Sequence, residues 1–193
     1  IKVSSEIGYL AAIVLLSLAV AMLSAADFGI SMIVAPSYLL SLKLPILSFG
    51  QAEYVIQAGL FIVLCVILRK FRAVYLFSFI TCLIYGFVLD LWRMIPFFNP
   101  SATEPGSMAL WLRIVMFVVG VSVTSFAIAL FFKTYLYPQV YDFFVKAVSV
   151  RYGIRLALLK TIVDLSCLTA GVIMTFAFFG EFRGIGWGTF VMA

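Results

Sequence analysis

Apolar stretches of about 20 residues, long enough for an α-helix to cross a hydrocarbon core of about 30 Å, recur along this whole chain. Charged residues make up 11% of the 193 positions, whereas a soluble domain carries about a quarter. The sequence therefore predicts an all-α membrane protein that crosses the bilayer several times. Function is then expected in the few polar residues that remain inside the bilayer.

Five complete spans and part of a sixth are predicted. The complete spans run over residues 6–26, 49–68, 73–92, 108–132 and 154–179. The sixth begins near Gly184, and only about half of the length that a crossing requires follows it. Because the first residue is Ile1 rather than Met, we expect a fragment that is trimmed at both ends.

The distribution of Lys and Arg between the spans favours a cytoplasmic N-terminus, because cytoplasmic loops carry the excess of positive charge. In this orientation the basic residues on the inside are Lys2, Arg69, Lys70, Arg72, Lys133, Lys146, Arg151 and Arg155. Those on the outside are Lys43, Arg93, Arg113 and Arg183, and Lys160 lies within the fifth span. We therefore expect a multi-pass protein of the plasma membrane whose N-terminus is inside.

Two connections between spans are unusual. Residues 28–46 are too apolar for a solvated loop, yet Gly29, Pro36 and Pro45 interrupt any long helix. This pattern predicts a broken or re-entrant segment. Aromatic and charged residues alternate after the fourth span, which indicates an interfacial amphipathic helix with a break near Pro138.

An exposed loop at residues 99–107 divides this single transmembrane domain, residues 1–193, into two halves, 1–98 and 108–193. Each half reads as three crossings with a broken segment after the first. Two such halves in series must be inverted in the membrane, an arrangement typical of secondary transporters. The alternative is that any six-span protein aligns weakly with itself.

Several strings carry a family resemblance: AADFGISMIVAPSYLLS, LSFGQAEYVIQ, LFSFITCLIYGFVLDLW, LLKTIVDL and FRGIGWGTF. With these strings the chain resembles the bacterial YczE/YyaS/YitT group of integral membrane proteins, and its YczE-like branch most of all. The resemblance implies a bacterial plasma-membrane (inner-membrane) protein with repeated helical halves. Most members of the group have no assigned activity, so the resemblance implies a fold more than a function.

Several kinds of chemistry are disfavoured. The chain has no His, and Cys65, Cys82 and Cys167 lie apart within apolar spans, so no metal site, disulfide framework or nucleophilic triad is expected. We expect neither an enzyme nor a cofactor. The net charge of +5 comes from residues that flank spans, which indicates contact with lipid headgroups rather than nucleic acid.

Polar residues inside the spans are the candidate substrate-binding residues, because burying them in lipid is costly. Glu53 and Gln57 lie one helical turn apart on the second span, and Lys160 and Asp164 have the same spacing on the fifth. The first pair could bind a polar solute or satisfy the backbone of the broken segment. The second pair could approach the same solute or form a structural ion pair.

The sequence leaves three functions open. The first is a transporter, or a transport subunit, for a small polar or aromatic solute bound between the halves. The second, a specific version of the first, is the substrate-binding component of an energy-coupling-factor vitamin importer. The third is a membrane protein that binds a partner or lipid and transports nothing. A partner subunit or a second copy could dock on the small residues Ala21 and Ala25, which could equally pack within the chain.

Overall fold

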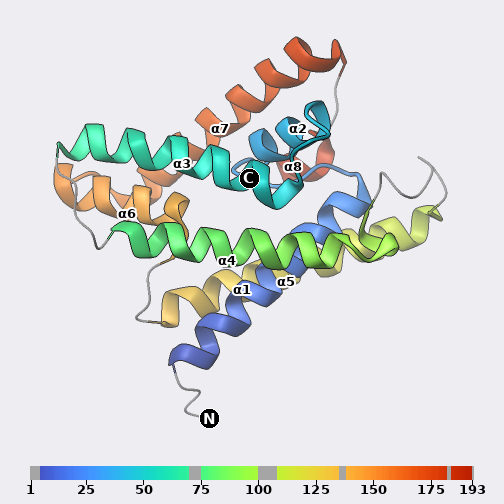
Figure 1. Cartoon of the computed structure of the whole chain (residues 1–193), viewed down its shortest axis with the longest axis horizontal. Helices are drawn as coiled ribbons and strands as arrows, with labels where there is room; N and C mark the ends of the chain where they lie inside the picture. Colours follow the sequence, from blue (N-terminus) through green and yellow to red (C-terminus); the bar gives the residue numbers. More distant parts are fainter. Residues whose placement is uncertain (1–4, 70–74, 100–107, 135–137, 182–183, 193) are drawn as a thin grey trace.

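The computed structural model describes residues 5–69, 75–99, 108–134, 138–181 and 184–192. Within these ranges all regular structure is helical. The helices, drawn in Figure 1, are α1 (Ser5–Ala26), α2 (Ala35–Lys43), α3 (Phe49–Leu68), α4 (Tyr75–Arg93), the 3₁₀ turn η1 (Pro96–Phe98), α5 (Leu110–Lys133), α6 (Val140–Tyr152), α7 (Leu156–Phe179) and α8 (Trp187–Val191).

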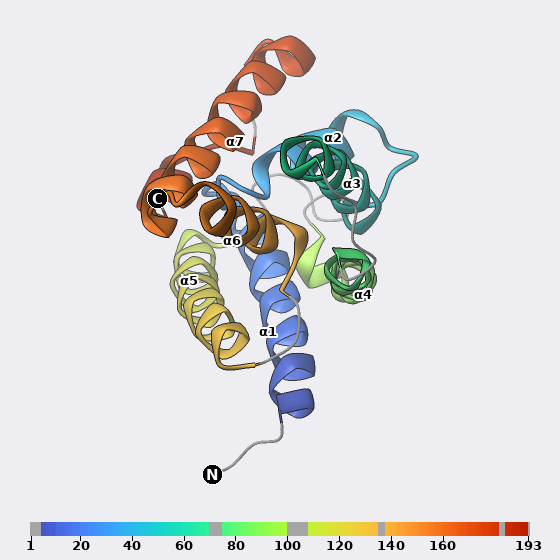
Figure 2. The ribbon, with the colours of Figure 1, turned by 90° about the vertical axis from the view of Figure 1, so that its left-hand side faces the viewer.

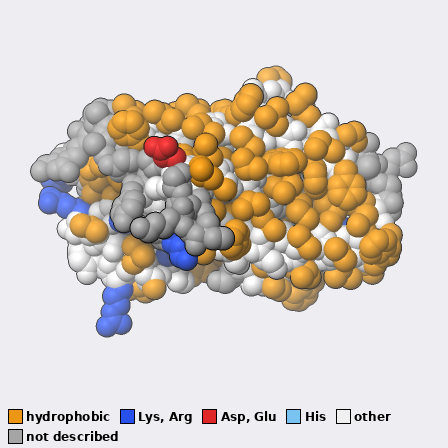
Figure 3. Space-filling view, turned by 90° about the horizontal axis from the view of Figure 1, so that it is seen from below, with side chains coloured by type: hydrophobic (Ala, Val, Ile, Leu, Met, Phe, Trp, Pro, Cys, Tyr) orange, Lys and Arg blue, Asp and Glu red, His pale blue; other side chains and the backbone are white. Residues whose placement is uncertain are grey.

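Five of these helices are long and apolar enough to cross a membrane: α1, α3, α4, α5 and α7. Their bounds agree closely with the five predicted spans, and α8 begins where the sixth was expected. Hydrophobic side chains cover most of the face that Figure 3 shows, and Lys and Arg gather toward one end of it. The chain is therefore a multi-pass membrane protein. Most of the predicted loop at 99–107 lies outside the described residues, as do Lys70 and Arg72.

The most extensive contact between two helices in the described part of the chain joins α1 and α5. Small residues let them approach closely, because a side chain at Gly120 would meet Leu23 at 3.0 Å. At one end of the pair, Arg113 of α5 donates to the carbonyl oxygen of Ala26 at 2.8 Å and to that of Asp27 at 3.0 Å. A cation thus closes the C-terminal end of α1, where the helix dipole favours positive charge.

The segment after α1 is broken as predicted. Gly29 has φ of +106°, a conformation that favours glycine, and Pro36 occupies the first turn of α2. The break is buried and takes its hydrogen bonds from the far end of the chain. Ile30 N–H donates to the carbonyl oxygen of Gly184, and Gly188 N–H donates to that of Phe28 at 2.8 Å. Irregular backbone is thereby satisfied inside the protein, as an apolar surrounding requires.

The helix after Pro138 differs from its prediction. We expected an interfacial helix, but the first residues of α6, Val140 and Tyr141, are buried. Figure 2 shows α6 near the middle of the bundle, and it contacts α3, α4 and α7. The apolar face of an amphipathic helix can cover either lipid or other helices, and here it covers helices. The exposed residues of α6 are Lys146 in its middle and Val150, Arg151 and Tyr152 at its end.

The start of α3 is fixed by its own cap and by α4. Ser48 accepts from the N–H of Gln51, whose side chain accepts in return from the N–H of Ser48, which forms a capping box. One turn along, the backbones of α3 and α4 nearly touch, because an added side-chain carbon at Gly50 would lie 2.1 Å from the carbonyl oxygen of Gly86. This contact positions the polar face of α3 against the interior.

Candidate functional site

The polar centre of the protein lies on α3. Glu53 and Gln57 are both fully buried, with 0% of their surface exposed. The Gln57 amide nitrogen donates to one oxygen of the Glu53 carboxyl group at 2.9 Å. The two residues that the sequence placed on one face therefore form a hydrogen-bonded pair inside the bundle.

Gln57 also holds the beginning of α6. Its side-chain oxygen accepts from the backbone N–H of Val140 at 3.3 Å, and its nitrogen donates to the side-chain oxygen of Gln139 at 3.5 Å. The first N–H groups of a helix have no partner within it, and here a glutamine of another helix supplies one. The orientation of the Gln57 amide is set by these contacts.

The half-helix α2, which belongs to the first half of the chain as α3 does, reaches the same place. The Ser37 hydroxyl lies 3.4 Å from the Tyr141 hydroxyl, which joins the first turn of α2 to the first turn of α6. Both hydroxyls lie near the Glu53 carboxyl group. In Figure 1 the two short helices lead away from this point in opposite directions. Two helix N-termini, each with a partial positive charge, thus face one buried acidic side chain.

Two polar atoms of this centre have no protein partner. They are the second oxygen of Glu53 and the side-chain nitrogen of Gln139, and both are buried. One is a hydrogen-bond acceptor and the other a donor. An unpaired polar group in an apolar interior costs about 1 to 3 kcal/mol, so these two atoms are an energetic cost that the fold carries at its polar centre.

The structure places Lys160 and Asp164 apart from this centre. The Lys160 amine lies 3.8 Å from the Asp164 carboxylate and 3.9 Å from that of Asp142 on α6. Its side chain is 45% exposed. Neither residue makes a hydrogen bond or ion pair with Glu53. The predicted set of four therefore divides into a buried pair on α3 and a partly exposed ionic cluster between α6 and α7.

A cavity of about 670 Å³ opens at the end of the molecule where α3 begins and α4 ends. We call it the vestibule. Its lining includes Ser41, Ser48, Phe49, Asp90, Arg93 and Asn99. Phe49 is 1% exposed and lies on the same face of α3 as Glu53, one turn away. The floor of the vestibule is therefore one helical turn from the polar centre.

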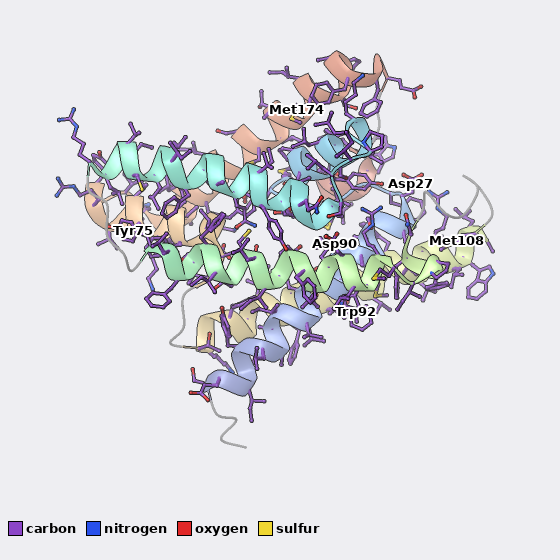
Figure 4. All side chains as sticks on the ribbon, viewed as in Figure 1. Asp27, Tyr75, Asp90, Trp92, Met108 and Met174 are labelled. Carbon is purple, nitrogen blue, oxygen red and sulfur yellow. The ribbon has the colours of Figure 1, made fainter. Side chains whose placement is uncertain are left out.

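Asp90 and Arg93 both lie in the last turn of α4, and they form no ion pair with one another. The Asp90 carboxylate accepts from the Ser48 hydroxyl at 2.5 Å and from the N–H of Gly50 at 2.8 Å. It thus caps the N-terminus of α3 and does not pair with the charge of Arg93 (Figure 4). Asp90 and Arg93 are only three positions apart in the sequence, but the N-terminus of α3 offers Asp90 two better-aligned donors.

The small residues on α1 are not available to a partner. Ala21 and Ala25 are 0% and 6% exposed, and they pack against neighbouring helices of the same chain. Of the two alternatives, packing within the chain is the one that the structure contains at these residues. No group of three His, Cys, Asp or Glu residues comes together to hold a metal ion in the described parts of the chain.

Sequence reasoning missed Ser37, Gln139 and Tyr141. A signal for two of them was present, because a polar residue directly follows the proline in each broken segment, as Pro36-Ser37 and Pro138-Gln139. A polar residue after a helix-starting proline lies in or beside the first turn, where it can reach whatever that helix end faces. Both prolines were used only as helix breakers.

One protein-family model matches the sequence: DUF6198, described as a family of unknown function, over residues 3–193. No curated protein matches the sequence, and no solved structure does.

Proposed function

Because the chain belongs to the DUF6198 family, which has no assigned function, we propose from its geometry that it is an integral membrane transporter or transport subunit. Its solute is small and polar, and the binding site lies between the two halves at Glu53 and Gln57. The observation that carries this proposal is the meeting of two half-helix N-termini at a buried carboxyl group with one unpaired oxygen. Broken helices of this kind form solute sites in secondary transporters.

The proposal includes six crossings in two inverted halves. An exchange of halves pairs α1 with α5, α2 with α6, and α3 with α7. The packing supports it, because α2 contacts both α3 and α7, and α6 contacts α7 and α3 in turn. The same exchange replaces α1 by α5 and α5 by α1, so the contact between these two helices corresponds to itself. An experimental structure in which residues 5–68 do not superpose on 110–179 about an axis in the membrane plane would overturn the repeat.

Location and orientation are part of the same proposal. The charge distribution supports a cytoplasmic N-terminus, and the resemblance to the YczE/YyaS/YitT group supports the bacterial plasma membrane. With this orientation the vestibule opens to the outside, and the exposed end of α6, with Arg151, lies inside. A solute would enter at the vestibule, pass Phe49 and reach Glu53.

Transport requires that the buried centre become accessible to water in some conformation. This can be tested without knowing the solute, by replacing Ser37 with cysteine in a variant whose three native cysteines are alanine. A water-soluble thiol reagent should modify Ser37→Cys in native membranes. A minor open state populated at about 1 to 10% would slow the reaction only about ten- to a hundredfold relative to an exposed thiol.

Ser17→Cys is the matched control. Ser17 is equally buried at 0% exposed, but it lies on α1 and its hydroxyl donates to Val14 of its own helix. The proposal expects modification of Ser37→Cys and none of Ser17→Cys. Equal protection of both cysteines would favour a solid interior and hence the partner- or lipid-binding function.

A second test measures uptake into vesicles for a panel of labelled vitamins, amines and small acids. Glu53→Gln should abolish the uptake that the parent protein gives, while leaving expression and folding nearly intact. The matched control is Glu6→Gln, because Glu6 is an exposed carboxylate at the first turn of α1. Uptake that survives Glu53→Gln would remove Glu53 from the site.

A further inference from the structure

The two charged side chains that line the vestibule differ in how far their hydrogen-bonding groups are already used within the protein. Asp90 and Arg93 are the charged residues of its lining. Both oxygens of Asp90 accept hydrogen bonds from the N-terminal turn of α3, which offsets the negative charge. The Asp90 oxygens are therefore engaged by the end of α3, and Arg93 is the charged residue of the lining that faces the cavity without such a cap.

The Arg93 guanidinium has donors to spare. One terminal nitrogen donates to Asn99 at 3.4 Å, a long hydrogen bond, and the Nε atom is buried beneath the cavity lining without a hydrogen-bond partner. The planar group lies over the Phe49 ring, with its central carbon 5.2 Å from the ring centre. Stacking on the ring holds the guanidinium in one orientation without using its hydrogen-bond donors.

We propose that the vestibule binds a small carboxylate-bearing solute, with Arg93 as the anchor for the carboxylate. An arginine presents paired N–H groups whose spacing matches the two oxygens of a carboxylate. The cavity volume of about 670 Å³ is that of a small-molecule site. Uncharged donors and acceptors on Ser41 and Asn99 lie around the same cavity and can contact the rest of the solute.

This inference deepens the proposed function by naming the solute class, and it rests on that function only for the fate of the bound solute. The position of Arg93 above Phe49, with Glu53 one turn below, places the anionic group outside the buried centre. The buried centre presents the Glu53 carboxyl group, whereas the vestibule presents the Arg93 guanidinium, so the vestibule is where an anionic group binds first.

The test measures binding to the purified protein in detergent, and it needs no transport. The probes are benzoate and benzamide, which share a shape and differ in charge, together with acetate and succinate. A ligand that binds only the folded state raises the unfolding temperature with its concentration. We expect a concentration-dependent rise with carboxylates, none with benzamide, and a weaker rise at higher salt.

Arg93→Gln should weaken carboxylate binding by at least tenfold, and Arg93→Lys, which keeps the charge but not the fork, should weaken it less. The matched control is Arg151→Gln, since Arg151 is exposed at the far end of α6. If Arg93→Gln does not fold, the comparison of benzoate with benzamide in the parent protein decides alone. Equal shifts with both probes, no shift with any carboxylate, or full binding by Arg93→Gln would overturn the proposal. The labelling of Ser37→Cys is independent of these results.

Discussion

The side-chain oxygen of Gln57 accepts a hydrogen bond from the backbone N–H of Val140, 3.3 Å away. This single contact ties a membrane-spanning helix of the first half to the broken segment of the second. It also fixes which end of the Gln57 amide faces Glu53, because the nitrogen is left to donate to the carboxyl group. The polar centre is thus assembled from both halves of the chain.

Replacing Gln57 with leucine should destabilise the protein strongly. The change leaves the Val140 N–H and one Glu53 oxygen without partners, and each such buried group costs about 1 to 3 kcal/mol. The measurement is the unfolding midpoint in mixed micelles. Gln51→Leu is the control on the same helix, since Gln51 is exposed and contributes only to the cap. Equal effects of the two variants would contradict the assigned role of Gln57.

Two glycines of α3 should respond in opposite ways to alanine. Gly50→Ala would force a carbon to within 2.1 Å of the Gly86 carbonyl oxygen, whereas a side chain at Gly59 meets nothing within 4 Å. We expect Gly50→Ala to cost about 1 to 3 kcal/mol through overpacking. Gly59→Ala should be neutral or stabilising, because alanine favours the helix by up to about 1 kcal/mol. Thermal unfolding of the two variants side by side checks this, and similar loss in both would show that α3 and α4 are not in close contact.

The ionic cluster between α6 and α7 should behave as a coupled unit. Lys160→Met removes the cation shared by Asp142 and Asp164 and leaves two carboxylates near one another. Stability should fall, and adding Asp142→Asn should restore part of it, with a coupling of about 0.5 to 3 kcal/mol. A double-mutant cycle gives the value. Additive losses would mean that Asp142 and Lys160 do not interact, and solute uptake should be affected only as far as folding is.

The orientation of the chain can be checked with two exposed positions. Met94 is 77% exposed just after α4, and Arg151 is exposed near the end of α6. In a variant without native cysteines, an impermeant maleimide added to intact cells should label Met94→Cys and spare Arg151→Cys. The reverse pattern would place the N-terminus outside, and labelling of both would mean that the reagent had crossed the membrane.

Much of the fold could be predicted from the sequence, and less of the site. The long helices follow from apolar length, which is a local property, and the break at Gly29 and Pro36 follows from backbone chemistry. The pair of Glu53 and Gln57 needed only the helical repeat. By contrast, Gln139 lies 82 positions from Gln57, and no local spacing brings them together. Glu53 and Lys160 have similar helical settings in the sequence, but similar settings on different helices need not face the same point, and Lys160 lies with Asp142 and Asp164 instead.

The hydrogen bonds that close the break after α1 have a consequence for biogenesis. Phe28 and Ile30 take their backbone partners from Gly188 and Gly184, residues that are synthesised more than 150 positions later. A membrane protein is synthesised from its N-terminus, so α1 waits in or near the translocation machinery with polar backbone that has no final partner. These backbone groups obtain their final partners only after Gly184 and Gly188 have been synthesised, which is after α3, α4, α5 and α7. Completion of the break that follows α1 is therefore tied to the arrival of α8.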